Sequence, residues 1–209
     1  MSVPVKFDNA NAFDNQLKTD AAANRFRIEG SYIVFDKNSN LSYPIIFGYT
    51  LGDLLTKNPV ASYTKLHKML LLRLQLLTQQ WYTTNGKNHK LVINSSYRSP
   101  EYNKTVPGSA TNSLHTKGHA IDIGTKLPQD LAMFYREFKL PGGLGIYKWG
   151  IHIDIGDVGQ TVFAEWDKTK DETKLRKLKD FLLPDTRRNY SILAVIGLLG
   201  FFIFKRITR

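Results

Sequence analysis

The 209-residue chain has no cysteine. This absence excludes disulfide bonds and any zinc site built on thiolates, so metal ligands must come from histidine and carboxylate side chains. The first 30 residues are rich in Asn, Asp and Ala, and they lack the basic start, apolar middle and small-residue cleavage site of a signal peptide. We expect residues 1–30 to form a polar N-terminal arm that is extended or loosely packed.

Acidic residues are scarce relative to basic ones. The chain has 18 Asp and Glu against 29 Lys and Arg, for a formal net charge of +11. Basic proteins associate with polyanions such as nucleic acid, anionic lipid and cell-wall polymers. The sequence contains no basic motif with interleaved aromatic residues of the kind that stacks on bases, so it does not favour a specific nucleic-acid partner.

Long apolar runs are missing until the C-terminus. Residues 191–204 are uncharged and are flanked by basic pairs at 187–188 and 205–206. The run is slightly shorter than the roughly 20 residues that span a bilayer. A buried core helix is the alternative, but a helix that is apolar on every face suits a small α+β domain poorly. We expect a single-pass membrane anchor at residues 190–206, in contact with lipid, preceded by a basic amphipathic segment at 161–189.

Two stretches in the middle of the chain alternate between apolar and polar residues, which is the pattern of half-buried strands. In residues 120–124 the isoleucines share one face and Asp122 lies on the other. In residues 151–155 three isoleucines share one face, and His152 and Asp154 share the opposite face. If these strands are neighbours in one sheet, Asp122 and His152 converge. His115, in the loop before the first strand, supplies a third polar group.

Two histidines and one carboxylate are typical zinc ligands, and three protein ligands leave a position open for water. This open position distinguishes catalytic from structural zinc sites, and it indicates metal-assisted hydrolysis. The alternative is that these histidines are ordinary surface or hydrogen-bonded residues, because five histidines are unexceptional in a chain of this size.

A set of motifs in this region resembles the D-alanyl-D-alanine carboxypeptidase family of zinc peptidases, which act on peptidoglycan and are structurally related to the hedgehog signalling domain. The resemblance covers roughly residues 50 to 157. It rests on SYRSPEYN at 96–103, SLH at 113–115, GHAIDI at 118–123, GLGIY at 143–147 and HID at 152–154.

The resemblance implies roles for individual residues. His115, Asp122 and His152 match the three zinc ligands of the family. Arg98 matches the arginine that binds substrate or stabilises the oxyanion, and a guanidinium suits this role because its planar fork pairs with oxyanions. Tyr97 and Ser113, which lie in the same motifs, are further candidates for substrate binding.

The chain departs from the family at the general base. Many relatives carry Asp or Glu three residues before the last histidine ligand, and this position holds Trp149 here. Asp154 is the nearest substitute, either as base or as a partner that holds the His152 ring. His119 is a second candidate for proton transfer.

The remaining pattern predicts an α+β fold, with a small antiparallel sheet, flanking helices and the hedgehog-like arrangement implied by the resemblance. We expect the peptidase domain at residues 31–160. Strands are expected at 31–35, 44–49 and 90–94. A core helix is expected from Asn58 to Tyr82, with its apolar stripe at Leu66, Met69, Leu70, Arg73, Leu74 and Leu77. Shorter helices are expected at 100–104 and 128–138, followed by a hairpin.

Together these features predict a membrane-anchored, zinc-dependent hydrolase that cuts a peptidoglycan stem-peptide bond, as a carboxypeptidase or an endopeptidase. A phage enzyme, acting in lysis or in a membrane-containing virion, is a hypothesis that suits this architecture. The alternative is a catalytically inactive peptidoglycan-binding or structural membrane protein on the same fold, and Trp149 at the position of the usual base motivates it.

Overall fold

The computed structural model describes residues 10–58, 61–86, 91–157 and 161–169, which belong to one compact unit ending at Thr169. The predicted anchor at 190–206 lies outside these residues, as does the basic amphipathic segment beyond Thr169, so both stay predictions. Among the described helices, none is long and apolar enough to span a membrane.

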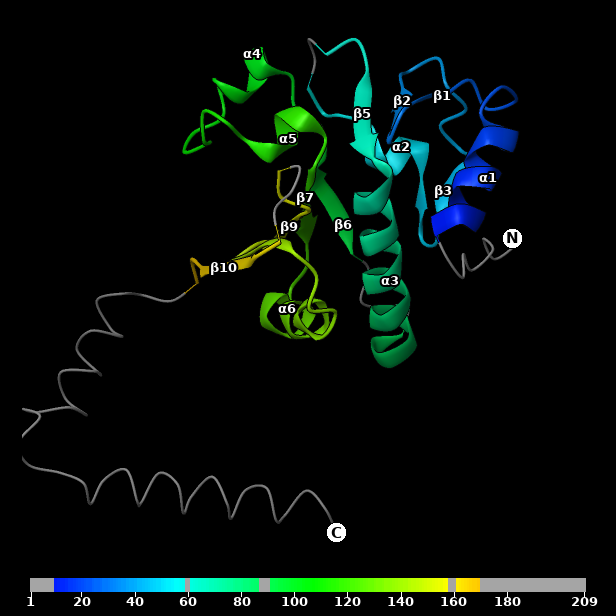
Figure 1. Ribbon diagram of the computed structural model, residues 1–209. Helices are drawn as coiled ribbons and strands as arrows, with labels where there is room; N and C mark the ends of the chain where they lie inside the picture. The colour runs from blue at the N-terminus through cyan, green and yellow to red at the C-terminus, as the bar shows by residue number, and fades with distance from the viewer. Residues whose placement is uncertain (1–9, 59–60, 87–90, 158–160, 170–209) are drawn as a thin grey trace, which may run out of the picture. The chain divides into compact units, whose positions relative to one another are not determined.

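The larger of the two main sheets has five strands in the order β10-β8-β9-β7-β6 (Figure 1). The strands are β6 (Val92–Ser95), β7 (Ala120–Gly124), β8 (Gly142–Tyr147), β9 (Gly150–Asp154) and β10 (Phe163–Asp167). All neighbours pair antiparallel except β10, which runs parallel to β8. The predicted α+β class is confirmed, whereas the antiparallel sheet is mixed because β10 follows the β8–β9 hairpin and returns to the free edge of β8.

The N-terminal residues pack into the same unit. Helix α1 (Ala10–Asp20) buries Phe13 and Leu17, so the expectation of a loosely packed arm is wrong for these residues. A three-stranded sheet follows, made of β1 (Arg27–Glu29), β2 (Tyr32–Phe35) and β5 (Thr64–His67). Strands β3 (Pro44–Ile46) and β4 (Tyr49–Thr50) form a small hairpin that leads into α2 (Leu51–Leu54).

Helix α3 (Lys68–Asn85) runs between the small sheet and the larger one (Figure 1). It starts about ten residues later than the sequence predicts, because residues 64–67 pair with β2 as a strand. The side chain of His67 then caps the helix by accepting a hydrogen bond from the Met69 amide. Most of the predicted stripe is buried, but Met69 is exposed.

The isoleucines of β7 and β9 are fully buried, as their alternation predicts, whereas Ile155, which follows β9, is partly buried. The isoleucines of the two strands belong to the same buried apolar cluster as the leucines of α3, and α6 (Pro128–Glu137) packs against β8 and β9, so the opposite, polar face of the sheet is left to carry the site. Two one-turn helices, α4 (Pro100–Asn103) and α5 (Leu114–Lys117), lie beyond this polar face (Figure 1). A rigid apolar layer thus fixes the strands on which the functional side chains lie.

We predict that the stability of the fold depends on pH through His67. Burial, helped by the nearby positive charges, lowers the pKa of His67 to about 4, below the value of 6.5 expected in the unfolded chain. Between these values the unfolded chain binds more protons, so the free energy of unfolding decreases as the pH falls from 6.5 to 4. The variant His67→Asn keeps a cap acceptor and removes the titration, and it should weaken this dependence.

Urea unfolding at pH 7 and pH 4.5 measures how much the free energy of unfolding changes with pH in the parent and in each variant. The variant His67→Ala, which also removes the cap, should share the weaker pH dependence but start from a lower stability at pH 7. Equal pH dependence in the parent and in both variants would show that another group is responsible.

Candidate active site

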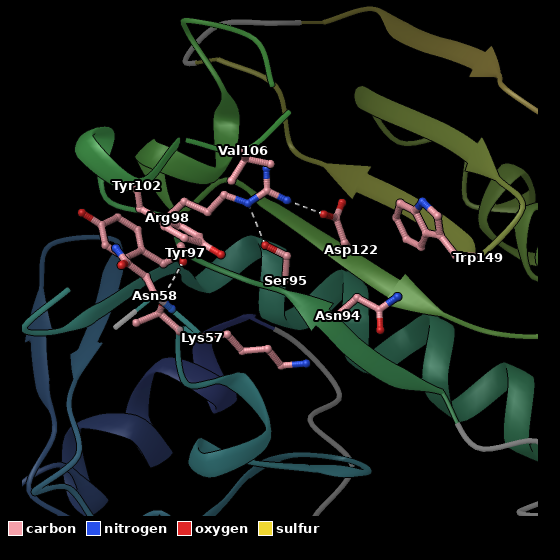
Figure 2. A pocket seen from close by; sticks show the side chains of 11 residues that line it. Lys57, Asn58, Asn94, Ser95, Tyr97, Arg98, Tyr102, Val106, Asp122 and Trp149 are labelled. Atoms are coloured by element: carbon pink, nitrogen blue, oxygen red, sulfur yellow. Dashed lines mark hydrogen bonds and ion pairs between the residues drawn. The ribbon is translucent and has the colours of Figure 1, made fainter. Parts of the chain in front are cut away.

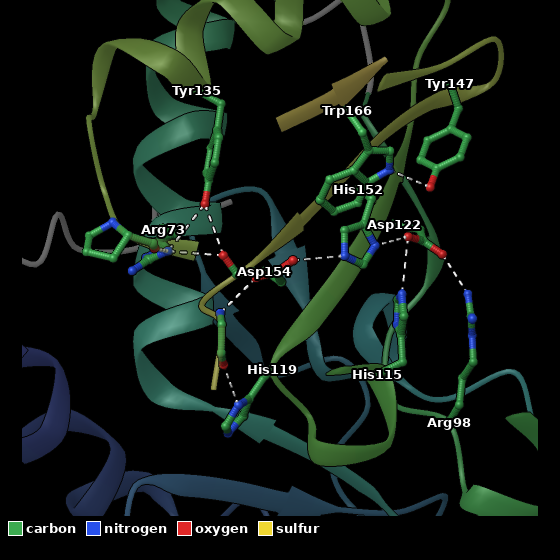
Figure 3. A network of polar contacts seen from close by, with 12 residues as sticks. Arg73, Arg98, His115, His119, Asp122, Tyr135, Tyr147, His152, Asp154 and Trp166 are labelled. Atoms are coloured by element: carbon green, nitrogen blue, oxygen red, sulfur yellow. Dashed lines mark hydrogen bonds and ion pairs between the residues drawn. The ribbon is translucent and has the colours of Figure 1, made fainter. Parts of the chain in front are cut away.

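The pairing of β7 with β9 places Asp122 directly opposite His152. His152 Nδ1 lies 2.8 Å from Asp122 Oδ1, and His115 Nε2, from α5, lies 3.2 Å from the same oxygen (Figure 3). One ligand atom from each of the three residues falls within 4.8 Å of the others. The structure therefore brings together the three residues that the sequence predicts as metal ligands.

Hydrogen bonds on the outer side of each ring fix which nitrogen carries a proton. His115 Nδ1 faces the Ser96 carbonyl oxygen at 2.6 Å, and His152 Nε2 faces Asp154 Oδ2 at 3.2 Å. Both outer nitrogens must donate, because both partners are acceptors. In their neutral forms the two imidazoles therefore direct lone pairs at Asp122 Oδ1, which is itself an acceptor. A proton or a metal ion has to lie between them.

The shifted pKa values of these residues reflect the same need for a positive charge between them. Burial alone lowers the pKa of His152, but its hydrogen bonds to Asp122 and Asp154 outweigh burial and raise the pKa to about 9. Burial raises the pKa of Asp122, but hydrogen bonds from the two histidines hold it well below its usual range. Burial lowers the pKa of His115, only partly offset by Asp122. When no metal ion is bound, a proton on His152 is the positive charge that holds the three side chains together.

The donor set also fits a metal ion. Two imidazole nitrogens and one carboxylate oxygen are ligands that zinc binds readily, and His115 and Asp122 are both buried. Each imidazole has the outer hydrogen-bond partner that metal-binding histidines usually have: a backbone carbonyl for His115 and a carboxylate for His152. A cation can therefore replace the proton without any change of tautomer.

Arg98 holds the second oxygen of Asp122. Its Nη2 lies 2.6 Å from Asp122 Oδ2, and its Nε donates to Ser95 Oγ at 2.8 Å. The ion pair is largely buried, with side-chain exposures of 14% for Arg98 and 11% for Asp122, so solvent screens it weakly. The carboxylate is thus oriented by the arginine on one oxygen and by the histidines on the other.

A cleft of about 380 Å³ opens beside the cluster (Figure 2). Asp122 and Arg98 line it, as does Tyr97, which the sequence predicts to bind substrate. Ser113 is not among the lining residues; it is buried at the start of α5, where its carbonyl accepts hydrogen bonds from Thr116. The described residues that line the cleft are Thr56, Lys57, Asn58, Asn94, Ser95, Tyr97, Arg98, Tyr102, Val106, Asp122 and Trp149.

Neither candidate for proton transfer is among these lining residues. Asp154 lies on the far side of the His152 ring from Asp122, and its second oxygen accepts a hydrogen bond from the Gly156 amide. His119 is buried between Tyr32 and the Gly156 carbonyl, which occupy its two ring nitrogens at 2.7 and 2.9 Å. Trp149, at the position of the usual base, does line the cleft.

Residues 55–156 match the family model described as Peptidase M15. The matched segment contains Arg98 and the whole cluster of His115, Asp122 and His152. This segment is an M15 peptidase domain. The match supports the family of D-Ala-D-Ala carboxypeptidase-type zinc peptidases that the sequence motifs predict. Neither a curated protein nor a solved structure matches the chain.

Arg73 supports the M15 site through the backbone of Asp154, a role that the sequence pattern does not reveal. Its guanidinium is buried, and Nη1 donates to the carbonyl oxygens of Pro141 and, at 3.1 Å, of Asp154 (Figure 3). The Tyr135 hydroxyl lies 3.4 Å from both Arg73 Nη1 and the Asp154 carbonyl. An arginine on the apolar stripe of a core helix was the available signal, because such a charge requires buried acceptors.

Trp166 of β10 forms a wall of the M15 site and was also missed. Its ring centre lies 5.5 Å from that of His152, and its Nε1 donates to the Tyr147 hydroxyl at 2.9 Å. The indole lies against β8, where a Cβ atom at Gly145 would be 2.5 Å from Trp166 Nε1. The GLG motif of β8 therefore makes room for an aromatic ring, although the sequence alone does not reveal which one.

We predict that Arg73→Met destabilises the protein. The carbonyls of Pro141 and Asp154 lose their arginine donor, at a cost of about 1–3 kcal/mol for each group left unsatisfied. Tyr135→Phe removes only long hydrogen bonds and should cost less than about 1.5 kcal/mol. Urea unfolding of the parent and both variants tests this order, and a loss in Arg73→Met no greater than in Tyr135→Phe would contradict it.

Proposed function

We propose that this protein is a zinc-dependent peptidase that hydrolyses a peptide bond in the stem peptides of peptidoglycan. The observation that carries the proposal is the convergence of two imidazole lone pairs and one carboxylate beside an open cleft within the M15 domain. His115 Nε2, Asp122 and His152 Nδ1 would hold the ion, and a three-ligand site leaves one position for reactants.

Bound zinc supplies a Lewis acid that polarises a carbonyl group and acidifies water. The protein's own residues orient the reaction around it. Arg98 lies next to Asp122 at the cleft wall, where its guanidinium can stabilise negative charge that develops on the carbonyl oxygen. Tyr97 forms another part of the wall and contacts the substrate backbone or side chains.

Asp154 acts in this proposal as a positioning residue. Its carboxylate accepts a hydrogen bond from His152 Nε2 and so keeps the lone pair of Nδ1 directed at the metal position. Its own position is fixed by the Gly156 amide on the carboxylate and by Arg73 on the backbone carbonyl. This arrangement supports the second of the two roles that the sequence leaves open for Asp154.

One observation favours a second candidate function. Among the described residues that line the cleft, Asp122 is the only carboxylate, and it belongs to the metal cluster. A protein that keeps the fold and the metal but binds peptidoglycan without cutting it would have this composition. The two functions share a substrate class and differ in turnover.

The C-terminal sequence supports an additional part of the proposal. The apolar run at 191–204, with basic residues on both sides, suits a membrane anchor over residues 190–206 that would keep the peptidase domain close to the lipid surface. Such an anchored wall-cutting enzyme suits a phage that acts in lysis or carries a membrane in its virion, and detection of the protein in purified virions would support the second role.

We predict that the full-length protein releases defined fragments from purified peptidoglycan, that a chelator stops the release and that added zinc restores it. His115→Ala and His152→Ala should each abolish the release, because either change removes a ligand. His67→Asn is the matched control, since it removes a histidine outside the cluster. Mass spectrometry of the products identifies the bond. Stoichiometric zinc binding with no product in any condition would support the binding function instead.

We also predict that Asp154→Asn lowers zinc affinity by about 10- to 100-fold, because loss of a charged outer partner weakens the histidine ligand. Competition with a fluorescent chelator measures the affinity directly, without any need for activity. Asp157→Asn changes an exposed carboxylate nearby and serves as control. An affinity equal to that of the parent would exclude the positioning role of Asp154.

A further inference from the structure

The cleft contains an exposed aromatic side chain that the proposed chemistry does not use. Trp149 is 42% exposed, and among the exposed large apolar side chains of the described residues it is the one that lines the cleft. Figure 2 shows its indole at one side of the cleft, across from Tyr97 and Tyr102. The exposed surface of this large indole therefore has no ligand assigned to it by the proposed chemistry.

The indole is held rigidly in place. Tyr147 stacks on it with ring centres 4.8 Å apart and planes 14° apart. The Tyr147 hydroxyl accepts the hydrogen bond from Trp166, whose ring packs beside His152. The Trp149 carbonyl accepts a hydrogen bond from the Thr125 amide, which fixes the turn between β8 and β9. An aromatic wall therefore runs from the third ligand of the cluster to the side of the cleft.

The stacking determines which part of the indole can receive a ligand. Tyr147 covers one face, so the exposed area belongs to the opposite face and the ring edge. An aromatic face carries partial negative charge and attracts polarised C–H groups or a cation. A ligand on Trp149 must therefore present a flat apolar face or a positive charge.

The charges of the cleft decide between these two possibilities. Two cationic side chains, Arg98 and Lys57, line the same cleft, and its one described carboxylate is engaged by Arg98 and the two histidines. A ligand ammonium would be repelled by these cations. The occupant of the Trp149 face is therefore a neutral ring with C–H groups on one side, which is the chemistry of a pyranose sugar.

We infer that Trp149, backed by Tyr147, is a subsite for a sugar ring of the glycan strand to which the stem peptide is attached. This inference rests on the proposed function, because the proposed substrate joins a peptide to amino sugars. Trp149 and Asp122 line one small cleft, so the sugar and the bond to be cut belong to the same short ligand. The enzyme then recognises its peptide through the sugar that carries it.

The test compares two soluble ligands, a disaccharide-peptide and the same peptide without sugars. Calorimetry with the chelator-treated full-length protein measures the Kd of each ligand without cleavage. We expect the parent to bind the disaccharide-peptide on the order of tenfold more tightly than the free peptide, as one aromatic contact provides. In Trp149→Ala this ratio should fall to about one, whereas Trp149→Phe should retain part of it.

Met133→Ala, which truncates an exposed apolar residue on α6, is the matched control and should keep the parent's ratio. A parent ratio of one, or the same ratio in the parent and in Trp149→Ala, overturns the sugar subsite. Equal loss of affinity for both ligands in Trp149→Ala would mean that the indole contacts the peptide instead, and it also overturns the inference. Failure of the proposed function is seen separately, as an absence of zinc-dependent cleavage of either ligand by the parent.

Discussion

The site depends on a single carboxylate oxygen, Asp122 Oδ1, at which two imidazole lone pairs are directed. Three electron-rich atoms converge there only because other contacts hold each of them in place, and a positive charge is needed to keep them together. The register of β7 against β9 produces this convergence. A slip of one residue would turn His152 into the isoleucine layer and bring Ile151 or Ile153 opposite Asp122.

The metal-ligand candidates and their neighbours form one continuous network of polar contacts. Arg73 contacts the backbone of Asp154, Asp154 contacts His152, His152 contacts Asp122, and Asp122 contacts Arg98 (Figure 3). Each carboxylate in this network accepts a hydrogen bond from a neighbouring side chain, Asp122 from Arg98 and Asp154 from His152. The network begins on the core helix α3 and ends at the cleft wall, so the hydrophobic core and the site share a structural support.

The parts of this arrangement that follow local rules were predictable from the sequence. Alternation in residues 120–124 and 151–155 assigned each side chain to a face, and the adjacent pairing of these strands placed Asp122 against His152. The parts that depend on distant partners were not. Residues 64–67 form a strand because β2 pairs with them, and nothing local distinguishes them from the start of the helix. Likewise, Arg73 gains its role only from Asp154, which lies 81 residues further along the chain. Trp166 gains its role only from His152, on a strand that is not its neighbour in the sheet.

Strand β10 contributes to the site from outside the segment that matches the M15 family. The segment that matches the M15 family ends at residue 156, yet Trp166 packs beside His152 from outside it, and Tyr32 contacts His119 from the other side. Genetic exchange at the borders of the matched segment would separate the metal cluster from side chains that enclose it. The matched segment therefore does not contain all of the side chains that enclose the cluster of His115, Asp122 and His152.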